Sequence, residues 1–103
     1  MKRPFAEMAG TGRYVPAKVL TNADLEKLVD TTNEWIIERT GIRERHIAAP
    51  GETIACMAEA ACRQVLEAAS VSVEEVYGIV VGTASWDRLL PSQACDLQKV
   101  LGA

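Results

Sequence analysis

The side chains of Trp35 and Arg39 are the pair in this sequence whose types and spacing could do chemistry. Residues four apart on a helix share one face, so the indole and the guanidinium would lie side by side. Two flat, polarisable groups at that spacing can hold a third flat group, such as a nucleotide base. The same spacing also suits an ordinary cation–π contact, in which Arg39 stacks on Trp35 or pairs with Glu34 or Glu38. Spacing alone leaves both interpretations open.

The helix that would carry this pair has recognisable ends. Thr31 followed by Glu34 has the spacing of a capping box, so the sequence predicts a helix over about residues 33–40. Gly41 is a common residue just after the end of a helix. The charged stretch 42–47 then suits an exposed strand.

The other predicted elements alternate between helices and strands. In chain order they are a strand within residues 5–15, a short helix capped by Thr21 with Asp24, a helix over 53–69, a helical turn over 73–76, a strand over 77–83 and a helix starting near Pro91. The stretch 77–83 is apolar throughout, which is typical of a central strand buried on both faces. This order predicts a layered α/β fold with a mixed sheet and packing helices, and no domain boundary within 1–103.

The composition excludes several classes of function. With 103 residues, 49% hydrophobic and 24% charged, the chain has the ordinary composition of one small globular domain. Its net charge of −3 gives no reason to expect a nucleic-acid partner. No apolar run approaches the roughly 20 residues that span a bilayer, and no apolar stretch follows the basic start, so we expect neither a membrane partner nor a secretory signal. The expected location is the cytoplasm.

A metal site is not expected either. Cys56, Cys62 and Cys95 are odd in number, no two form a C-x-x-C pair, and His46 is the single histidine. These counts predict three reduced thiols and no metal.

A longer motif surrounds the Trp35–Arg39 pair. The pattern D-T-x-x-E-W-I-x-x-R-T-G-I-x-x-R is intact as Asp30-Thr31, Glu34-Trp35-Ile36 and Arg39–Arg43, with Arg45-His46 following. Through it, the stretch 21–50 resembles the start of the β-ketoacyl-acyl-carrier-protein synthase III family, which has a thiolase-like fold. The resemblance implies an acyltransferase that condenses an acyl-CoA primer, similar to acetyl-CoA, with malonyl-carrier protein in fatty-acid biosynthesis. It also implies acyl-CoA and acyl-carrier protein as partners, a homodimer, and coenzyme A thioester as substrate with no separate cofactor.

The resemblance assigns roles to three residues of this motif. Trp35 and Arg39 would hold the coenzyme A adenine between them, and Thr31 would contact it by hydrogen bonding. The catalytic residues of the family lie further along a longer chain. Residues 1–103 would therefore form a partial N-terminal thiolase-like domain that is inactive alone.

The resemblance also argues against a catalytic role for the cysteines and the histidine. Cys95 falls in a P-S-x-A-C segment that precedes the family's nucleophile turn, so we expect it to be buried in a helix. Cys62 is expected to be packed, Cys56 to be exposed, and His46 to lie on the surface, because the family's catalytic histidine comes from the second half of the chain.

The loop 86–90 departs most from the family pattern. In the family this loop lies at the dimer contact and presents a bulky residue, commonly phenylalanine, to the partner's acyl pocket; here Leu90 occupies that position. The primer preference is therefore open, and a starter synthase of secondary metabolism is an alternative.

The glycines Gly10 and Gly12 have a weaker match to a known motif. They hint at dinucleotide binding, but Val15 stands where that fingerprint needs its third glycine. The resemblance instead explains them as a strand-to-loop turn.

A stand-alone nucleotide- or CoA-binding module, or a non-catalytic interaction subunit, is the alternative to an enzyme segment. The two would be distinguished by whether the reading frame continues past Ala103 into an A-A-C motif. Because the strand at 77–83 would have few neighbours within 103 residues, the isolated chain is expected to be marginally stable or self-associating.

Overall fold

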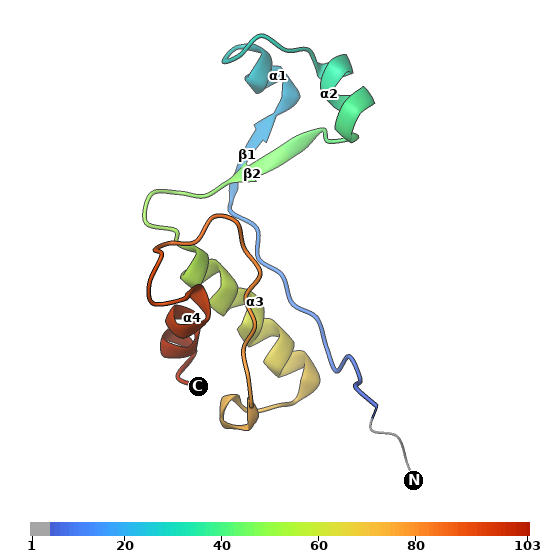
Figure 1. Cartoon of the computed structure of the whole chain (residues 1–103). Coiled ribbons are helices and arrows are strands. Elements are labelled where there is room, and N and C mark those ends of the chain that lie inside the picture. The colour runs from blue at the N-terminus through green and yellow to red at the C-terminus, as the bar shows by residue number, and fades with distance from the viewer. Residues whose placement is uncertain (1–4) are drawn as a thin grey trace. The chain divides into compact units, whose positions relative to one another are not determined.

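The computed structural model describes residues 5–103, which fall into two compact units (Figure 1). One unit is Val15–Glu52, and the other combines the segment that ends at Tyr14 with Thr53–Ala103. The elements in chain order are β1 (Lys18–Thr21), α1 (Asn22–Glu26), α2 (Asn33–Thr40), β2 (Glu44–Ile47), α3 (Ile54–Ala69), the 3-10 turn η1 (Val73–Glu75) and α4 (Gln93–Leu101).

The first unit is built on an antiparallel pair of strands. β1 and β2 pair with Lys18 opposite Ile47 and Thr21 opposite Glu44. Helix α1 follows β1 directly, and its predicted capping box is confirmed: Asp24 N–H donates to Thr21 Oγ1 at 3.2 Å, and Thr21 N–H donates to the Asp24 carboxylate at 3.1 Å. Both helices lie at the same end of the strand pair in Figure 1. The strand predicted over 42–47 is confirmed as β2, whereas β1 was not predicted.

The start of α2 corrects one prediction. Thr32, not Thr31, is the N-cap, and its hydroxyl accepts a hydrogen bond from Trp35 N–H at 3.2 Å. The expected box of Thr31 with Glu34 is wrong by one residue. A carboxylate from the preceding helix accounts for the shift, because Glu26 accepts a hydrogen bond from Asn33 N–H at 2.6 Å and so satisfies a first-turn donor.

In the second unit, α4 lies beside α3 (Figure 1). The helix predicted over 53–69 is confirmed as α3, with Thr53 as its N-cap. On α4, Leu97 and Leu101 are four residues apart and both are buried, so they form the apolar face of this helix.

An acidic side chain from the loop before α4 completes the cap of α3. Asp87 accepts hydrogen bonds from Ile54 N–H at 2.9 Å and from Ala55 N–H at 3.0 Å. It also accepts one from the Gln93 side-chain amide at 2.9 Å. The loop is therefore tied to the first turns of both helices. These hydrogen bonds, that from Ile54 first, lower the pKa of Asp87.

The segment that contains Gly10 and Gly12 runs along α3. A Cβ atom on Gly12 would lie 2.1 Å from the Ala61 carbonyl oxygen, and one on Gly10 would lie 3.2 Å from Val65 Cγ2. The glycines thus allow a backbone to approach a helix closely, which corrects both the turn and the phosphate-loop interpretations. The strand predicted within residues 5–15 is not formed, because this segment contacts a helix instead of a strand.

The apolar stretch 77–83 is not a strand in the described structure. The only strand ladder within residues 5–103 is that of β1 and β2. Tyr77 and Val80 are fully exposed. The pattern predicted an apolar extended segment, but a strand also needs hydrogen-bonding neighbours, which these residues do not supply. No helix in the described part of the chain is long and apolar enough to cross a membrane.

The tight contact at Gly12 predicts a large cost for a small substitution. Gly12→Ala should lower the free energy of unfolding by about 1–3 kcal/mol, because the methyl group would force the segment away from α3. Gly78→Ala is the matched control, since nothing lies within 4 Å of its Cβ position. Urea unfolding followed by circular dichroism measures both. Equal effects of the two substitutions would contradict the proposed close approach.

The Asp87 cap predicts a pH-dependent stability. A carboxylate whose pKa is lowered on folding stabilises the protein above its unfolded pKa, and this stabilisation is lost as the pH falls through the folded pKa. Asp87→Asn should therefore be less stable than the wild type above about pH 5, with the difference shrinking below about pH 4. Glu67→Gln, which removes an exposed carboxylate of α3, is the charge-matched control. A stability difference for Asp87→Asn that is independent of pH would contradict this role.

Candidate functional site

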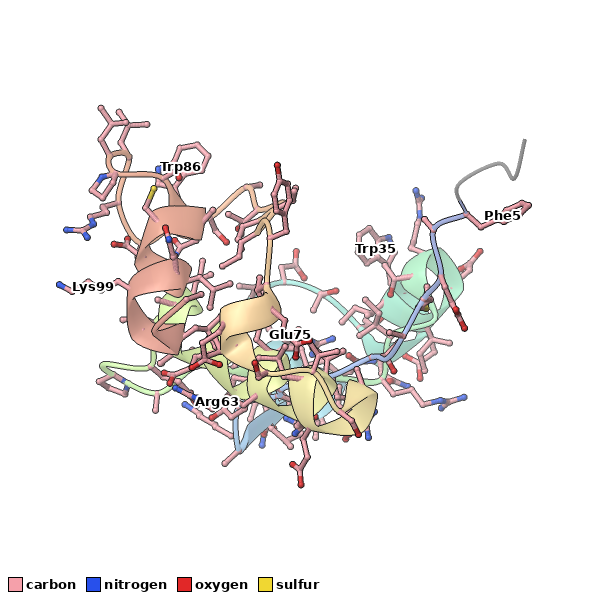
Figure 2. All side chains as sticks on the ribbon, turned by 90° about the horizontal axis from the view of Figure 1, so that it is seen from below. Phe5, Trp35, Arg63, Glu75, Trp86 and Lys99 are labelled. Atoms are coloured by element: carbon pink, nitrogen blue, oxygen red, sulfur yellow. The ribbon has the colours of Figure 1, made fainter. Side chains whose placement is uncertain are left out.

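Trp35 and Arg39 lie on one exposed face of α2. The Arg39 guanidinium carbon is 5.4 Å from the centroid of the Trp35 ring, which confirms that the two side chains lie side by side. Trp35 is 54% exposed, an unusual position for a large apolar side chain, and it projects from α2 (Figure 2). An exposed indole beside a cation is suited to stacking on a flat ligand.

A surface hollow of about 250 Å³ lies against this indole. It is lined by Asp30, Thr31, Thr32 and Trp35. The structure therefore brings two of the three predicted site residues, Thr31 and Trp35, into one hollow, while Arg39 lies beside Trp35 and does not line it. The volume is below the roughly 300–1,000 Å³ of pockets that enclose whole ligands. It suits one ring system better than a complete coenzyme.

The spacing of the indole and the guanidinium sets a condition on any clamp. A flat ring held between two others needs about 7 Å between the outer layers, since each stacked contact is about 3.5 Å. The observed 5.4 Å is too short for such an insertion. Arg39 must therefore rotate away from Trp35 before a ring can enter between them. Its side chain is exposed and lies in the last turn of α2, so it is free of the packing that would prevent this rotation.

A buried polar network holds α2 in place. Asn22, the first residue of α1, is only 2% exposed. Its amide nitrogen donates to Asn33 Oδ1 and to the Ile42 carbonyl oxygen, both at 2.9 Å, and its amide oxygen accepts from Arg45 at 2.7 Å. Sequence reasoning missed this network. The one available signal was an amide side chain in the first turn of a short helix, which does not reveal its partners.

The loop that carries Leu90 is exposed and apolar. Leu89 and Leu90 are 73% and 79% exposed, and Trp86 is 50% exposed (Figure 2). A hollow of about 190 Å³ lies beside the loop and is lined by Val81, Thr83, Trp86, Arg88, Leu89, Ser92 and Gln93. Leu90 is not among these residues and projects its side chain into solvent. The tip of the loop is therefore an apolar surface with nothing covering it.

An ion pair supports this loop. The Arg88 guanidinium donates to both Asp96 carboxylate oxygens, through Nε at 3.0 Å and through a terminal nitrogen. The hydrogen bond from Arg88 lowers the pKa of Asp96, and the same bond raises the pKa of Arg88.

The three cysteines and the histidine differ in how well they were predicted. Cys95 is exposed, so the prediction that it is buried is wrong; it lies on the face of α4 opposite to Leu97 and Leu101, which fill the contact with α3. Cys56 is exposed as predicted, and Cys62 is partly buried. His46 is on the surface, as predicted, with Nδ1 2.6 Å from the Pro16 carbonyl oxygen.

Cys95 also borders a surface hollow. This hollow has a volume of about 280 Å³ and is lined by Val76, Tyr77, Gly78, Ile79, Ala94, Cys95, Gln98 and Ala103. None of these residues is a base that could deprotonate the thiol. No group of three or more potential metal ligands occurs among the described residues.

The sequence was compared with family models and with curated proteins. No family model matches. The chain is 52% identical over 98 residues to the β-ketoacyl-[acyl-carrier-protein] synthase III of Thiobacillus denitrificans, and 58% identical over 102 residues to that of Xylella fastidiosa. These alignments cover 95% and 99% of this chain but only 31% and 32% of the relatives. The chain therefore spans about a third of the length of the proteins it matches.

Solved structures agree with the sequence comparison. The 3-oxoacyl-[acyl-carrier-protein] synthase III of Aquifex aeolicus is 49% identical with a TM-score of 0.87, over 92% of this chain and 30% of that one. The priming β-ketosynthase of the R1128 polyketide pathway is 39% identical with a TM-score of 0.91, over 99% of this chain and 30% of that one. The fold is thus part of a thiolase-like α/β architecture. In sequence and in fold, the chain belongs to the β-ketoacyl-[acyl-carrier-protein] synthase III family.

Proposed function

We propose that this chain is part of a condensing acyltransferase that joins an acyl-CoA primer to malonyl-carrier protein, and that α2 binds the adenine of the coenzyme. The observation that carries the proposal is the exposed Trp35–Arg39 pair beside the hollow at Thr31, in a chain 52% identical to a synthase III. Stacking on an indole is favourable for any base, and a hydroxyl in the hollow adds a polar contact.

The described geometry suggests how the adenine binds. The base enters the hollow and stacks on Trp35, with Thr31 offering a hydrogen bond at its edge. Arg39 rotates outward and closes over the exposed face of the base, so that its planar guanidinium becomes the second layer of the clamp. Coenzyme A thioester acts here as a substrate, and no further cofactor is invoked.

The same proposal gives the Leu90 loop its role. An exposed apolar tip, anchored from below by Asp87, is suited to insertion into an apolar pocket of a second subunit. We propose that the synthase is a homodimer in which Leu90 contacts the partner's acyl site. The acyl-carrier protein is the second substrate, and the cytoplasm is the proposed location.

The primer and the pathway admit a second candidate. The likeness to a priming β-ketosynthase of polyketide biosynthesis favours a starter synthase of secondary metabolism as the alternative. Both candidates use the same adenine site and differ in the acyl group. Comparing acetyl-CoA with longer acyl-CoA primers at equal concentration would separate them. A stand-alone CoA-binding module would bind acyl-CoA without any condensation.

Replacing the indole tests the adenine site. In the complete synthase that carries this segment, Trp35→Ala should raise the KM for acyl-CoA about tenfold, because base–aromatic stacking contributes roughly 1–3 kcal/mol. The kcat should change little, since the indole is remote from the reacting thioester. Steady-state kinetics with acyl-CoA, and with an acyl-pantetheine that lacks the nucleotide, give the comparison. Unchanged acyl-CoA kinetics would remove the adenine site from the proposal.

The cysteines supply a second test. Because none of the residues that line the hollow at Cys95 is a base, this thiol has no partner to activate it for nucleophilic attack. After incubation of the synthase with radiolabelled acyl-CoA, the acyl group should be absent from peptides that contain Cys56, Cys62 or Cys95. Peptide mapping measures this, with an iodoacetamide-treated sample as the control. Label on Cys95 would assign the chemistry to this chain itself.

A further inference from the structure

Asn22 is the most deeply buried polar side chain among the described residues, and its amide contacts both ends of α2. The side-chain nitrogen donates to Asn33 Oδ1, at the first residue of α2, at 2.9 Å. The same nitrogen donates to the Ile42 carbonyl oxygen, just beyond the last turn, also at 2.9 Å. One NH₂ group thus fixes the distance between the two ends of the helix that carries Trp35.

Arg45 fixes the orientation of this amide. Its guanidinium donates to Asn22 Oδ1 at 2.7 Å and to the Leu20 carbonyl oxygen at 3.2 Å. A guanidinium has donors only, so it can bind the amide oxygen and not the amide nitrogen. The NH₂ group is therefore directed toward Asn33 and Ile42. In addition, Asn22 N–H donates to the Arg43 carbonyl oxygen at 3.2 Å, which joins α1 to the segment that leads into β2.

The other helix contact acts in the same direction. Glu26, at the end of α1, accepts a hydrogen bond from Asn33 N–H at 2.6 Å. Asn33 is therefore held from both ends of α1, by Asn22 through its side chain and by Glu26 through its backbone. A buried polar group whose hydrogen bonds are all formed restricts its neighbours to one arrangement, because any other arrangement leaves a buried donor or acceptor unpaired.

We propose that Asn22 is a positioning residue for the adenine site: together with Arg45 it holds α2 in the orientation that presents Trp35 to the coenzyme. This inference rests on the proposed adenine-binding function of α2. It predicts that a change at Asn22, which faces no ligand, alters the affinity for the nucleotide part of the substrate and leaves the condensation chemistry intact.

Asn22→Asp is the sharpest variant. The carboxylate has almost the same shape as the amide and keeps the contact with Arg45, but it cannot donate to Asn33 or Ile42 and places an oxygen against the Ile42 carbonyl oxygen. In the complete synthase, the KM for acyl-CoA should rise about tenfold, since two hydrogen bonds are lost. The kcat/KM for an acyl-pantetheine without the nucleotide should stay within about twofold of the wild-type value.

Two further variants complete the design. Gln64→Glu makes the same amide-to-carboxylate change on α3, where Gln64 accepts a hydrogen bond from Arg13 N–H, and should leave both substrates unaffected. Arg45→Lys is the milder variant if Asn22→Asp does not fold. It keeps the charge, loses the paired contacts to Leu20 and Asn22, and should raise the acyl-CoA KM in the same direction.

Trp35→Ala, measured in parallel, separates the two proposals. A rise in acyl-CoA KM for Trp35→Ala but not for Asn22→Asp would overturn the positioning role and leave the adenine site standing. No rise for Trp35→Ala would overturn the adenine site and the positioning role with it. An equal loss with acyl-CoA and with acyl-pantetheine in Asn22→Asp would show a general structural role and would also overturn the inference.

Discussion

The free N–H groups in the first turn of each helix are the constraint on which the local structure depends. A helix cannot satisfy these donors from within, so other parts of the chain must supply acceptors. The first turn of α2 is satisfied by Thr32 and Glu26, and that of α3 by Thr53 and Asp87. In each case one acceptor is a neighbour in sequence and the other comes from further away. The distant acceptor joins a second element to the helix, and in this way Asp87 fixes the loop that ends in Leu90.

This division explains what could be predicted from the sequence. Local caps have a spacing signature, and Thr21 with Asp24 was found by it. Two adjacent threonines before α2 offer the same signature in two registers, and the sequence alone gave no reason to choose Thr32. The distant acceptor Glu26 decides the register, because it satisfies Asn33 N–H and removes the need for a second local acceptor. Such contacts have no sequence spacing that could reveal them.

The buried core shows the same limit. The periodicity of α4 identified Leu97 and Leu101, and both are buried. The pattern of 77–83 identified an apolar segment equally well, yet Tyr77 in it is fully exposed. Periodicity reports which residues prefer burial, whereas strand formation also depends on a neighbour with free backbone groups. Because the chain spans about a third of the length of its relatives, the layered fold is established by the comparison with whole synthases and not by the sheet of this chain.

The two interpretations of the Trp35–Arg39 spacing describe two states of one site. The observed cation–π contact at 5.4 Å is the arrangement without a ligand. Such a contact contributes about 0.5–1 kcal/mol at an exposed position. Stacking of a base on an aromatic side chain contributes roughly 1–3 kcal/mol, and a guanidinium that closes over the base regains part of its own contact. Opening the pair therefore costs less than the base supplies. The resting contact also keeps Arg39 close to the site, which leaves a single side-chain rotation between the free and the bound arrangement.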